Sequence, residues 1–216
     1  MFDNYIAKLK MSKSANTEAL IENSKTFLDN NFTTSPSYYI VEINGEEEGV
    51  IINRTTDYNV KKVYFKSSSK PELGSLIKYK DSFYILLSKD EDELVLFGDM
   101  EECNNTIKIQ KEEAKEELVG YDQDGRPHYK EIVSFDDEPC IVRDTYYSTS
   151  ENAQLPLPNG KLEITIKYQP MLNIDVNKEI VMYEKNYKIT DINYVNVIDG
   201  VGYVKVNAER RQLDNE

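Results

Sequence analysis

The stretch that decides the fold reads LGSLIKYKDSFYI over residues 73–85, and IVMYEKNYKI over residues 180–189 spells nearly the same pattern. In each, apolar and aromatic residues stand on both sides of a short polar turn. This arrangement is typical of a β-hairpin, in which a tight turn joins two antiparallel strands. The recurrence predicts a modular β protein with two similar barrel-like halves.

The best match between the two spellings sets Tyr79 over Tyr183. Phe83 then falls on Tyr187, and both pairs of aromatic residues flank a turn. We therefore expect these four side chains to occupy equivalent places in the two halves. The similarity is open to two explanations, duplication of one unit or the common chemistry of hairpins.

The composition supports a fold that is mainly β. The chain has 216 residues, of which 39% are hydrophobic and 30% charged, with 16 Tyr and no Trp. This is enough apolar material to bury a core, and Tyr in short runs with Val, Ile and Thr favours strands. We predict two barrel- or sandwich-like modules of short antiparallel strands, preceded by a helical segment.

Residues 1–34 form the predicted N-terminal helical segment. Its apolar residues recur at helical spacing, and they include Leu20, Ile21, Phe27 and Leu28. Ser14 or Asn16 is a candidate N-cap, which makes residues 1–11 a candidate separate short helix. The apolar stripe either packs on the chain's own barrel or docks on a neighbouring subunit.

The first β module is expected over residues 35–110. A strand at 38–43, the turn pair Asn44-Gly45 and a strand at 49–52 open it, and five more short strands are expected, up to residues 106–109. That number and spacing of strands are typical of a small barrel or sandwich.

Residues 111–160 are expected to separate the modules as an acidic linker, a hairpin and a long extended loop. The linker covers 111–119, and Asp122-Gln123-Asp124-Gly125 is a strong turn signal between two strands. Residues 144–160 have little strand character, and their length suggests an arm that orders against another subunit. The second β module and a polar tail occupy residues 161–216.

The charge of the chain limits its partners. The formal net charge is −13, whereas binding to a nucleic-acid backbone requires a basic face. We therefore expect no tight binding to DNA and no attraction to an anionic membrane. No signal-peptide profile opens the sequence, and Cys103 and Cys140 form no disulfide framework, so both are expected to be thiols in a reducing cytoplasm.

No pattern of catalytic, cofactor-binding or metal-binding residues emerges. The one histidine, His128, follows Pro127 in a predicted hairpin and is expected to be a surface strand residue. Residues 120–131 have the Gly and Glu positions of a calcium loop, but Gly120 stands where the first carboxylate belongs. We therefore expect no enzyme activity, no cofactor and no metal.

Several segments resemble a known family. They include Ser35-Pro36-Ser37-Tyr38 before the first strand, Cys103-Asn104-Asn105-Thr106-Ile107-Lys108, the Asp-Gly hairpin after it, and Glu138-Pro139-Cys140. Over residues 30–207 this order resembles virion structural proteins of tailed bacteriophages of low-GC Gram-positive bacteria, whose genes commonly lie among head and connector genes. The chain departs from the family pattern in its acidic segment 111–119 and in Ile109, where many members have Trp.

The resemblance implies a subunit of the head-tail connector or neck, in the virion. Such a subunit would form a homo-oligomeric ring around the DNA channel and contact the portal or other neck or tail proteins. Alternatives are a tail or baseplate subunit, a carbohydrate-binding β module that uses coplanar tyrosines, and a small hydrolase that uses His128. The candidate subunit-interface residues are Leu20, Phe27, Tyr146, Tyr147, Leu155 and Leu157.

Overall fold

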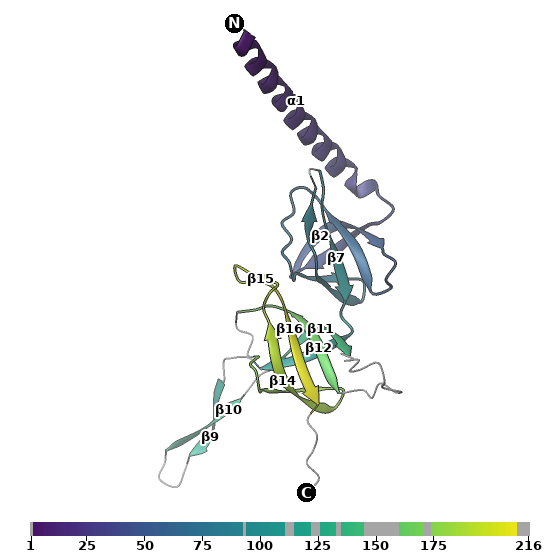
Figure 1. The fold of residues 1–216 in the computed structure, drawn as a ribbon. Helices are drawn as coiled ribbons and strands as arrows, with labels where there is room; N and C mark the ends of the chain where they lie inside the picture. Colours follow the sequence, from purple (N-terminus) through teal and green to yellow (C-terminus); the bar gives the residue numbers. More distant parts are fainter. Residues whose placement is uncertain are drawn as a thin grey trace, which may run out of the picture. The chain divides into compact units, whose positions relative to one another are not determined.

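The computed structural model describes residues 2–92, 94–110, 115–121, 126–132, 135–144, 160–170 and 174–210. The chain divides into two compact units, Met1–Glu102 and Cys103–Glu216 (Figure 1). Each unit is a barrel-like sheet of antiparallel strands, and the first unit also carries the N-terminal helix. The prediction of a mainly β protein with two β modules and an N-terminal helical segment is confirmed.

The N-terminal segment forms one continuous helix, α1 (Phe2–Asn31), followed by the single 3₁₀ turn η1 (Phe32–Thr34). The expectation of a separate short helix over residues 1–11 is wrong. Ser14 and Asn16 lie inside α1 rather than at its start. Both residue types tolerate a helix interior at a modest cost, so their capping preference does not by itself break a helix.

The first barrel consists of six strands that close on themselves and one short additional strand. Around the ring the order is β1-β2-β3-β7-β5-β4, and β4 pairs with β1 to complete it. The strands are β1 (Tyr38–Ile43), β2 (Glu46–Arg54), β3 (Val60–Phe65), β4 (Leu76–Tyr79), β5 (Ser82–Leu86), β6 (Asp90–Glu91) and β7 (Leu96–Glu102). Alternate residues point inward, so that Val50, Val63, Ile77, Leu86 and Met100 are fully buried.

The second barrel repeats this order with different strands. Its path is β8-β11-β12-β16-β14-β13, and β13 lies beside β8. The strands are β8 (Asn105–Gln110), β11 (Phe135–Asp144), β12 (Lys161–Lys167), β13 (Glu179–Met182), β14 (Lys185–Asn193), β15 (Val197–Ile198) and β16 (Val201–Arg210). Cys140, Ile164, Ile189 and Val206 are fully buried in its core.

The two barrels share one topology. Replacing β1, β2, β3, β4, β5 and β7 by β8, β11, β12, β13, β14 and β16 reproduces the strand order. The minor strands correspond too, because β6 pairs with β7 just as β15 pairs with β16. The insertions differ. The hairpin β9 (Lys115–Tyr121) and β10 (Pro127–Ile132) stands in the second unit where Asn44-Gly45 makes a two-residue turn in the first.

Two segments lie elsewhere than the sequence suggested. The strand expected at 106–109 is β8, which pairs with β11 and belongs to the second unit, so the first unit ends at Glu102 rather than at residue 110. Within the segment expected to be a solvated linker, residues 115–119 are strand, because they pair with β10. Of the long segment 144–160, the structure describes only its two end residues.

The two matched hairpins have equivalent backbone hydrogen bonds, but the equivalent residues are offset by one position from those that the sequence match pairs. In the first, Gly74 N–H donates to Leu86 O (2.8 Å) and Leu86 N–H donates to Ser75 O (3.0 Å). In the second, Asn177 N–H donates to Ile189 O (2.9 Å) and Ile189 N–H donates to Lys178 O (2.9 Å). Gly74 and Asn177 both have positive φ, 77° and 75°. The same device therefore opens both hairpins.

This register overturns the expected equivalence of Tyr79 with Tyr183. Tyr79 is buried at the end of β4 and corresponds to buried Met182, whereas Tyr183 is 57% exposed. Tyr183 and Glu184 form the turn itself, with φ of 51° and 61°. Because side chains alternate between faces, a shift of one residue exchanges buried and exposed positions. Tyr187 thus corresponds to buried Tyr84, not to Phe83.

This register predicts unequal costs for two aromatic truncations in the second hairpin. Tyr187→Ala should lower the free energy of unfolding by about 3–5 kcal/mol, because it removes a ring buried in the core. Tyr183→Ala should change it by less than about 0.5 kcal/mol, because that ring is largely exposed. Urea unfolding of the two variants measures both values, and equal losses would contradict the register.

Candidate functional site

The candidate interface residues that the structure describes lie on α1. Leu20 is 66% exposed and Phe27 is 67% exposed, so neither side chain is buried on the chain's own barrel. The other four candidates, Tyr146, Tyr147, Leu155 and Leu157, lie outside the described residues. The structure therefore offers an exposed apolar stretch on the helix, and the other four residues stay a prediction.

Contacts at its C-terminal end tie the helix to the first barrel. The Asp29 carboxylate accepts hydrogen bonds from the Ser67 backbone N–H (3.1 Å) and from the Ser67 hydroxyl. Just beyond the helix, Phe32 is buried and the Lys66 ammonium lies 6.0 Å from its ring centroid. These contacts fix the last turn of the helix, while Leu20 stays exposed two turns earlier.

A groove of about 730 Å³ opens at one end of the first barrel. The end of β2, the start of β3, the loop between them and the β4–β5 turn border it. Three cationic side chains line it, Arg54, Lys61 and Lys80, together with the carboxylates of Asp57 and Glu102. In an acidic chain, this is a local concentration of positive charge.

Three tyrosines form the aromatic wall of the groove. The Tyr39 and Tyr79 ring centroids lie 5.0 Å apart, and those of Tyr79 and Tyr84 lie 6.0 Å apart. Burial, together with the charge and the hydrogen-bond acceptance of the Glu102 carboxylate, raises the pKa of Tyr84 to about 12. Tyr84 therefore stays a neutral hydrogen-bond donor to Glu102 at physiological pH.

The same wall argues against the carbohydrate-binding alternative at this groove. Stacking on sugars requires exposed rings that share a plane. Here the interplanar angles are 76° for Tyr39 with Tyr79 and 59° for Tyr79 with Tyr84, and the last two rings are buried. These three rings do not share a plane, and Tyr58 is the largely exposed tyrosine among the residues that line the groove.

Sequence reasoning did not identify this groove. In the sequence, Lys61 stands beside Lys62 in a short basic stretch, and Arg54 stands alone on the other side of a five-residue loop. The pairing of β2 with β3 brings the two together, because Arg54 lies directly opposite Lys61. A hairpin prediction that joined 49–52 to 60–65 would have given this pair, whereas the tyrosine wall depends on closure of the barrel.

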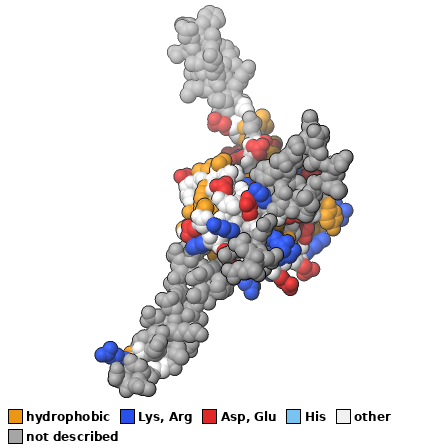
Figure 2. Space-filling view, turned by 60° about the horizontal axis from the view of Figure 1, so that its bottom comes forward, with side chains coloured by type: hydrophobic (Ala, Val, Ile, Leu, Met, Phe, Trp, Pro, Cys, Tyr) orange, Lys and Arg blue, Asp and Glu red, His pale blue; other side chains and the backbone are white. Residues whose placement is uncertain are grey.

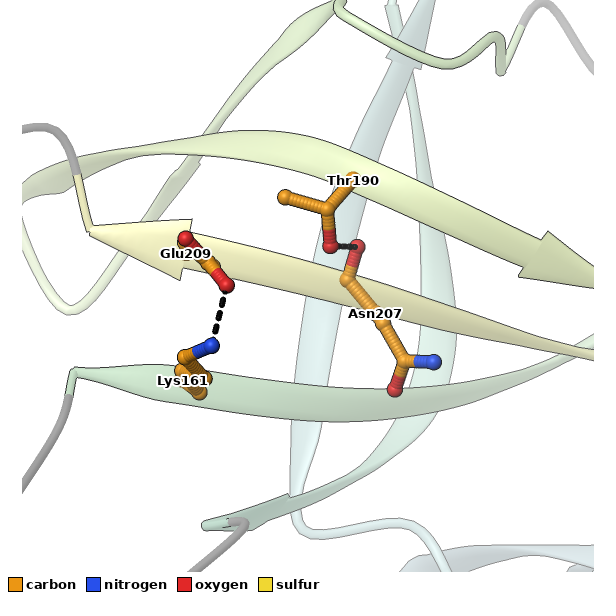
Figure 3. A network of polar contacts seen from close by, with 4 residues as sticks. All are labelled: Lys161, Thr190, Asn207 and Glu209. Carbon is orange, nitrogen blue, oxygen red and sulfur yellow. Dashed lines mark hydrogen bonds and ion pairs between the residues drawn. The ribbon is translucent and has the colours of Figure 1, made fainter. Parts of the chain in front are cut away.

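The second barrel carries polar pairs on three neighbouring strands. The Lys161 ammonium of β12 lies 2.5 Å from the Glu209 carboxylate of β16, and the Thr190 hydroxyl of β14 donates to the Asn207 carbonyl over 3.1 Å (Figure 3). Lys205 and Glu163 form a further pair, with 3.1 Å between nitrogen and oxygen. Partly exposed pairs of this kind add little stability.

The asparagine of the distinctive Cys-Asn-Asn-Thr piece has a structural role. The Asn104 side-chain amide donates to the Val142 carbonyl and accepts from the Val142 N–H, both over 2.8 Å. The Asn104 side chain thereby satisfies both backbone hydrogen-bonding groups of Val142 on β11, as a neighbouring strand would. This bond joins the start of the second unit to its own barrel.

Side chains that could bind a metal ion do not gather at one place within the described residues. No cluster of three or more His, Cys, Asp or Glu side chains suited to a metal ion occurs in the described part of the chain. His128 lies in β10, but its side chain is outside the described residues, as are Asp122 and Asp124 of the calcium-like segment. Within the described ranges, α1 and η1 lack the apolar length that a membrane crossing requires.

The comparison with known families concerns the second unit. The model of the YomX C-terminal domain matches residues 99–209, just over half of the 216-residue chain. The chain belongs to this family. The match covers the barrel of β8 and β11–β16 together with its inserted hairpin, and it begins within β7 of the first unit.

One curated relative shares more than this domain. The SPbeta prophage-derived protein YomX of Bacillus subtilis (strain 168) is 21% identical over 141 residues, which cover 64% of this chain. The match spans 65% of that relative, less than two thirds of its length. No solved structure matches the chain. The family and this relative support a phage origin, as the resemblance implies.

Surface charge in the described region is mixed. In Figure 2, Lys and Arg side chains alternate with Asp and Glu side chains over the described part of the face in view. Neither sign of charge gathers there into a continuous stripe. A DNA backbone binds most strongly to a continuous basic surface, and this face does not supply one.

The YomX C-terminal domain contains both cysteines, and their environments predict unequal reactivity. Both are thiols rather than halves of a disulfide, as expected, with Cys103 half-buried and Cys140 fully buried. Burial raises the pKa of Cys140 to about 12, so at pH 8 almost none of it is the reactive thiolate.

We therefore expect a thiol reagent at pH 8 to modify Cys103 of the folded protein readily and Cys140 only after denaturation. Cys103→Ala should remove the fast phase, and Cys140→Ala should leave it. Two fast thiols in the folded protein, or none after denaturation, would contradict this assignment.

Proposed function

We propose that this chain is a non-enzymatic structural subunit of a phage particle, in the head-tail connector or neck. The main support for this proposal is the chain's membership of the YomX C-terminal domain family, together with its match to a prophage-derived protein. The tandem barrels support the proposal, because small closed barrels leave few unpaired strand edges and serve well as rigid building blocks.

The net charge of −13 suits a subunit that DNA passes without being held. In this proposal the chain forms a homo-oligomeric ring, contacts portal, neck or tail proteins, is made in the bacterial cytoplasm and resides in the virion. The second candidate is a tail or baseplate subunit, which the same family membership favours equally.

In this proposal α1 supplies a contact to a neighbouring subunit. Leu20 and Phe27 are each about two thirds exposed, and burying one such side chain contributes roughly 1.5–3 kcal/mol. An exposed apolar stretch on a helix that is anchored at one end is suited to docking in a partner's groove.

The test is the protein content of purified particles. In particles of the phage or prophage that encodes this chain, gradient purification followed by mass spectrometry should detect it at the copy number of a ring component. Absence from intact particles would overturn the proposal, and labelling visible in electron micrographs distinguishes neck from baseplate.

The helix contact makes a further prediction. Leu20→Ser with Phe27→Ser should reduce incorporation into particles at least about tenfold, because a lost apolar contact of 1.4 kcal/mol corresponds to tenfold in affinity. Thermal unfolding should stay unchanged, since both side chains are exposed. Ile40→Ser is the matched control, because Ile40 is 67% exposed on the first barrel and lies off the helix. Equal incorporation of all three proteins would contradict the helix contact.

A further inference from the structure

The groove of the first barrel brings together cations without giving them carboxylate partners. Among the described residues, Arg54, Lys61 and Lys80 form no ion pair with Asp or Glu. The Glu102 carboxylate, which also lines the groove, receives the Tyr84 hydroxyl, and Asp57 lies on an exposed loop. The positive charge of the groove is therefore only partly balanced.

The lining of the groove includes an unfavourable pair of charges. Arg54 on β2 and Lys61 on β3 are direct cross-strand neighbours. Like charges placed directly opposite each other destabilise a sheet, whereas an opposite charge at this place would stabilise it. An anion bound between the two side chains would remove the repulsion.

Aromatic rings hold the two lysines in place. The Lys61 ammonium lies 5.2 Å from the Tyr84 ring centroid, and the Lys80 ammonium lies 5.1 Å from that of Tyr79 and 5.8 Å from that of Tyr39. A ring face attracts an ammonium group but does not neutralise it. Both cations are thus oriented at the groove and remain available to an anion.

The opposite end of the same barrel presents a complementary anionic segment. Asp90, Glu91 and Asp92 are all exposed. Asp92 Oδ1 accepts the backbone N–H groups of Leu94 (2.8 Å) and Val95 (2.7 Å). These two bonds, and the nearby Lys25, lower the pKa of Asp92, so its carboxylate is charged and held in place.

The topology separates the two features within one chain. β6 pairs with Leu96 and Phe97 at the start of β7, whereas Glu102, at the end of β7, lines the groove. Six residues of strand correspond to about 20 Å, so one chain cannot place its acidic segment in its own groove. Two chains can do so in head-to-tail fashion.

We propose that the groove at Arg54, Lys61 and Lys80 receives the acidic segment Asp90–Asp92 of a second copy of this chain. The inference deepens the proposed function, on which it rests, by naming a contact that builds the ring. A head-to-tail contact between different surfaces generates closed rings or open filaments, unlike a two-fold contact, which stops at a dimer. The contact is electrostatic, so salt should weaken it.

A nucleic acid is the less favoured occupant. Three cations with two nearby carboxylates neutralise few phosphates, and the chain as a whole repels a polyanion. A carboxylate segment of three residues matches the size of the groove better than a duplex does.

The test uses two charge-reversal variants of the full chain. The groove variant is Arg54→Glu with Lys61→Glu, and the loop variant is Asp90→Lys with Asp92→Lys. Sedimentation at low salt should show self-association of the unmodified chain, and each variant alone should associate about 100-fold more weakly, because like charges then meet at the contact. An equimolar mixture of the two should associate again, since acidic grooves then meet basic loops and the reverse.

The matched control is Lys185→Glu with Lys188→Glu, which makes the same charge change on exposed positions of β14. It should associate as the unmodified chain does. Arg54→Gln with Lys61→Gln gives a neutral groove variant, and circular dichroism with thermal unfolding verifies that all variants are folded.

Three results would overturn the inference: association of the groove variant equal to that of the unmodified chain, failure of the mixture to restore association, or a monomeric unmodified chain at every concentration. Binding of a short DNA duplex that the groove variant abolishes would also overturn it, since the ligand would then be phosphate.

The protein content of purified particles distinguishes failure of this inference from failure of the proposed function. Normal incorporation of the groove variant would remove the contact and leave the virion role, whereas absence of the unmodified chain from particles would remove the virion role alone.

Discussion

Each barrel depends on a residue in the left-handed region of the backbone that opens its fourth-to-fifth strand hairpin. Gly74 and Asn177 turn their N–H groups onto the carbonyls of Leu86 and Ile189, and the return bond fixes the register of the pair. Once the register is fixed, alternate residues face the core, although Ile85, between Tyr84 and Leu86, is buried as well. Ile77, Tyr84 and Leu86 in one barrel and Ile180, Tyr187 and Ile189 in the other are buried for this reason. Gly adopts such a conformation without strain, and Asn is among the residues that tolerate it best.

The shared strand order shows how one architecture serves two units with different surfaces. A two-residue turn joins β1 to β2, while the corresponding connection from β8 to β11 contains the β9–β10 hairpin. The connection from β2 to β3 is a short loop that borders the groove, while that from β11 to β12 carries residues 145–160. The cores keep the fold, and the connections carry the differences, as is usual where loops vary on a rigid scaffold.

The surfaces fit a role in assembly. The first unit combines a helix with exposed Leu20 and Phe27, a groove with unbalanced cations and an exposed acidic segment. The second unit, which contains most of the YomX C-terminal domain, presents polar pairs on β12, β14 and β16. Apolar docking and electrostatic pairing are complementary, because the first supplies affinity and the second supplies orientation and salt sensitivity.

The fold class, the two β modules, the N-terminal helix and most strands of the first barrel can be predicted from the sequence. These follow from local signals, namely alternation of apolar residues, the Asn44-Gly45 turn and the helical spacing of Leu20, Phe27 and their neighbours. The sequence could not determine the hairpin register, because Tyr183 is as apolar as Tyr79 and only the backbone at Asn177 decides which residue makes the turn.

Three further features depend on contacts between distant segments, which the structure reveals. It assigned β8 to the second barrel through pairing with β11, a contact between residues some 30 apart in the sequence. It joined residues 115–119 to β10 as a strand despite their charge. It also built the groove, since strand pairing sets Arg54 against Lys61 and barrel closure brings Tyr39, Tyr79 and Tyr84 together. Such contacts depend on which strands close the ring, and no local pattern of residues encodes that closure.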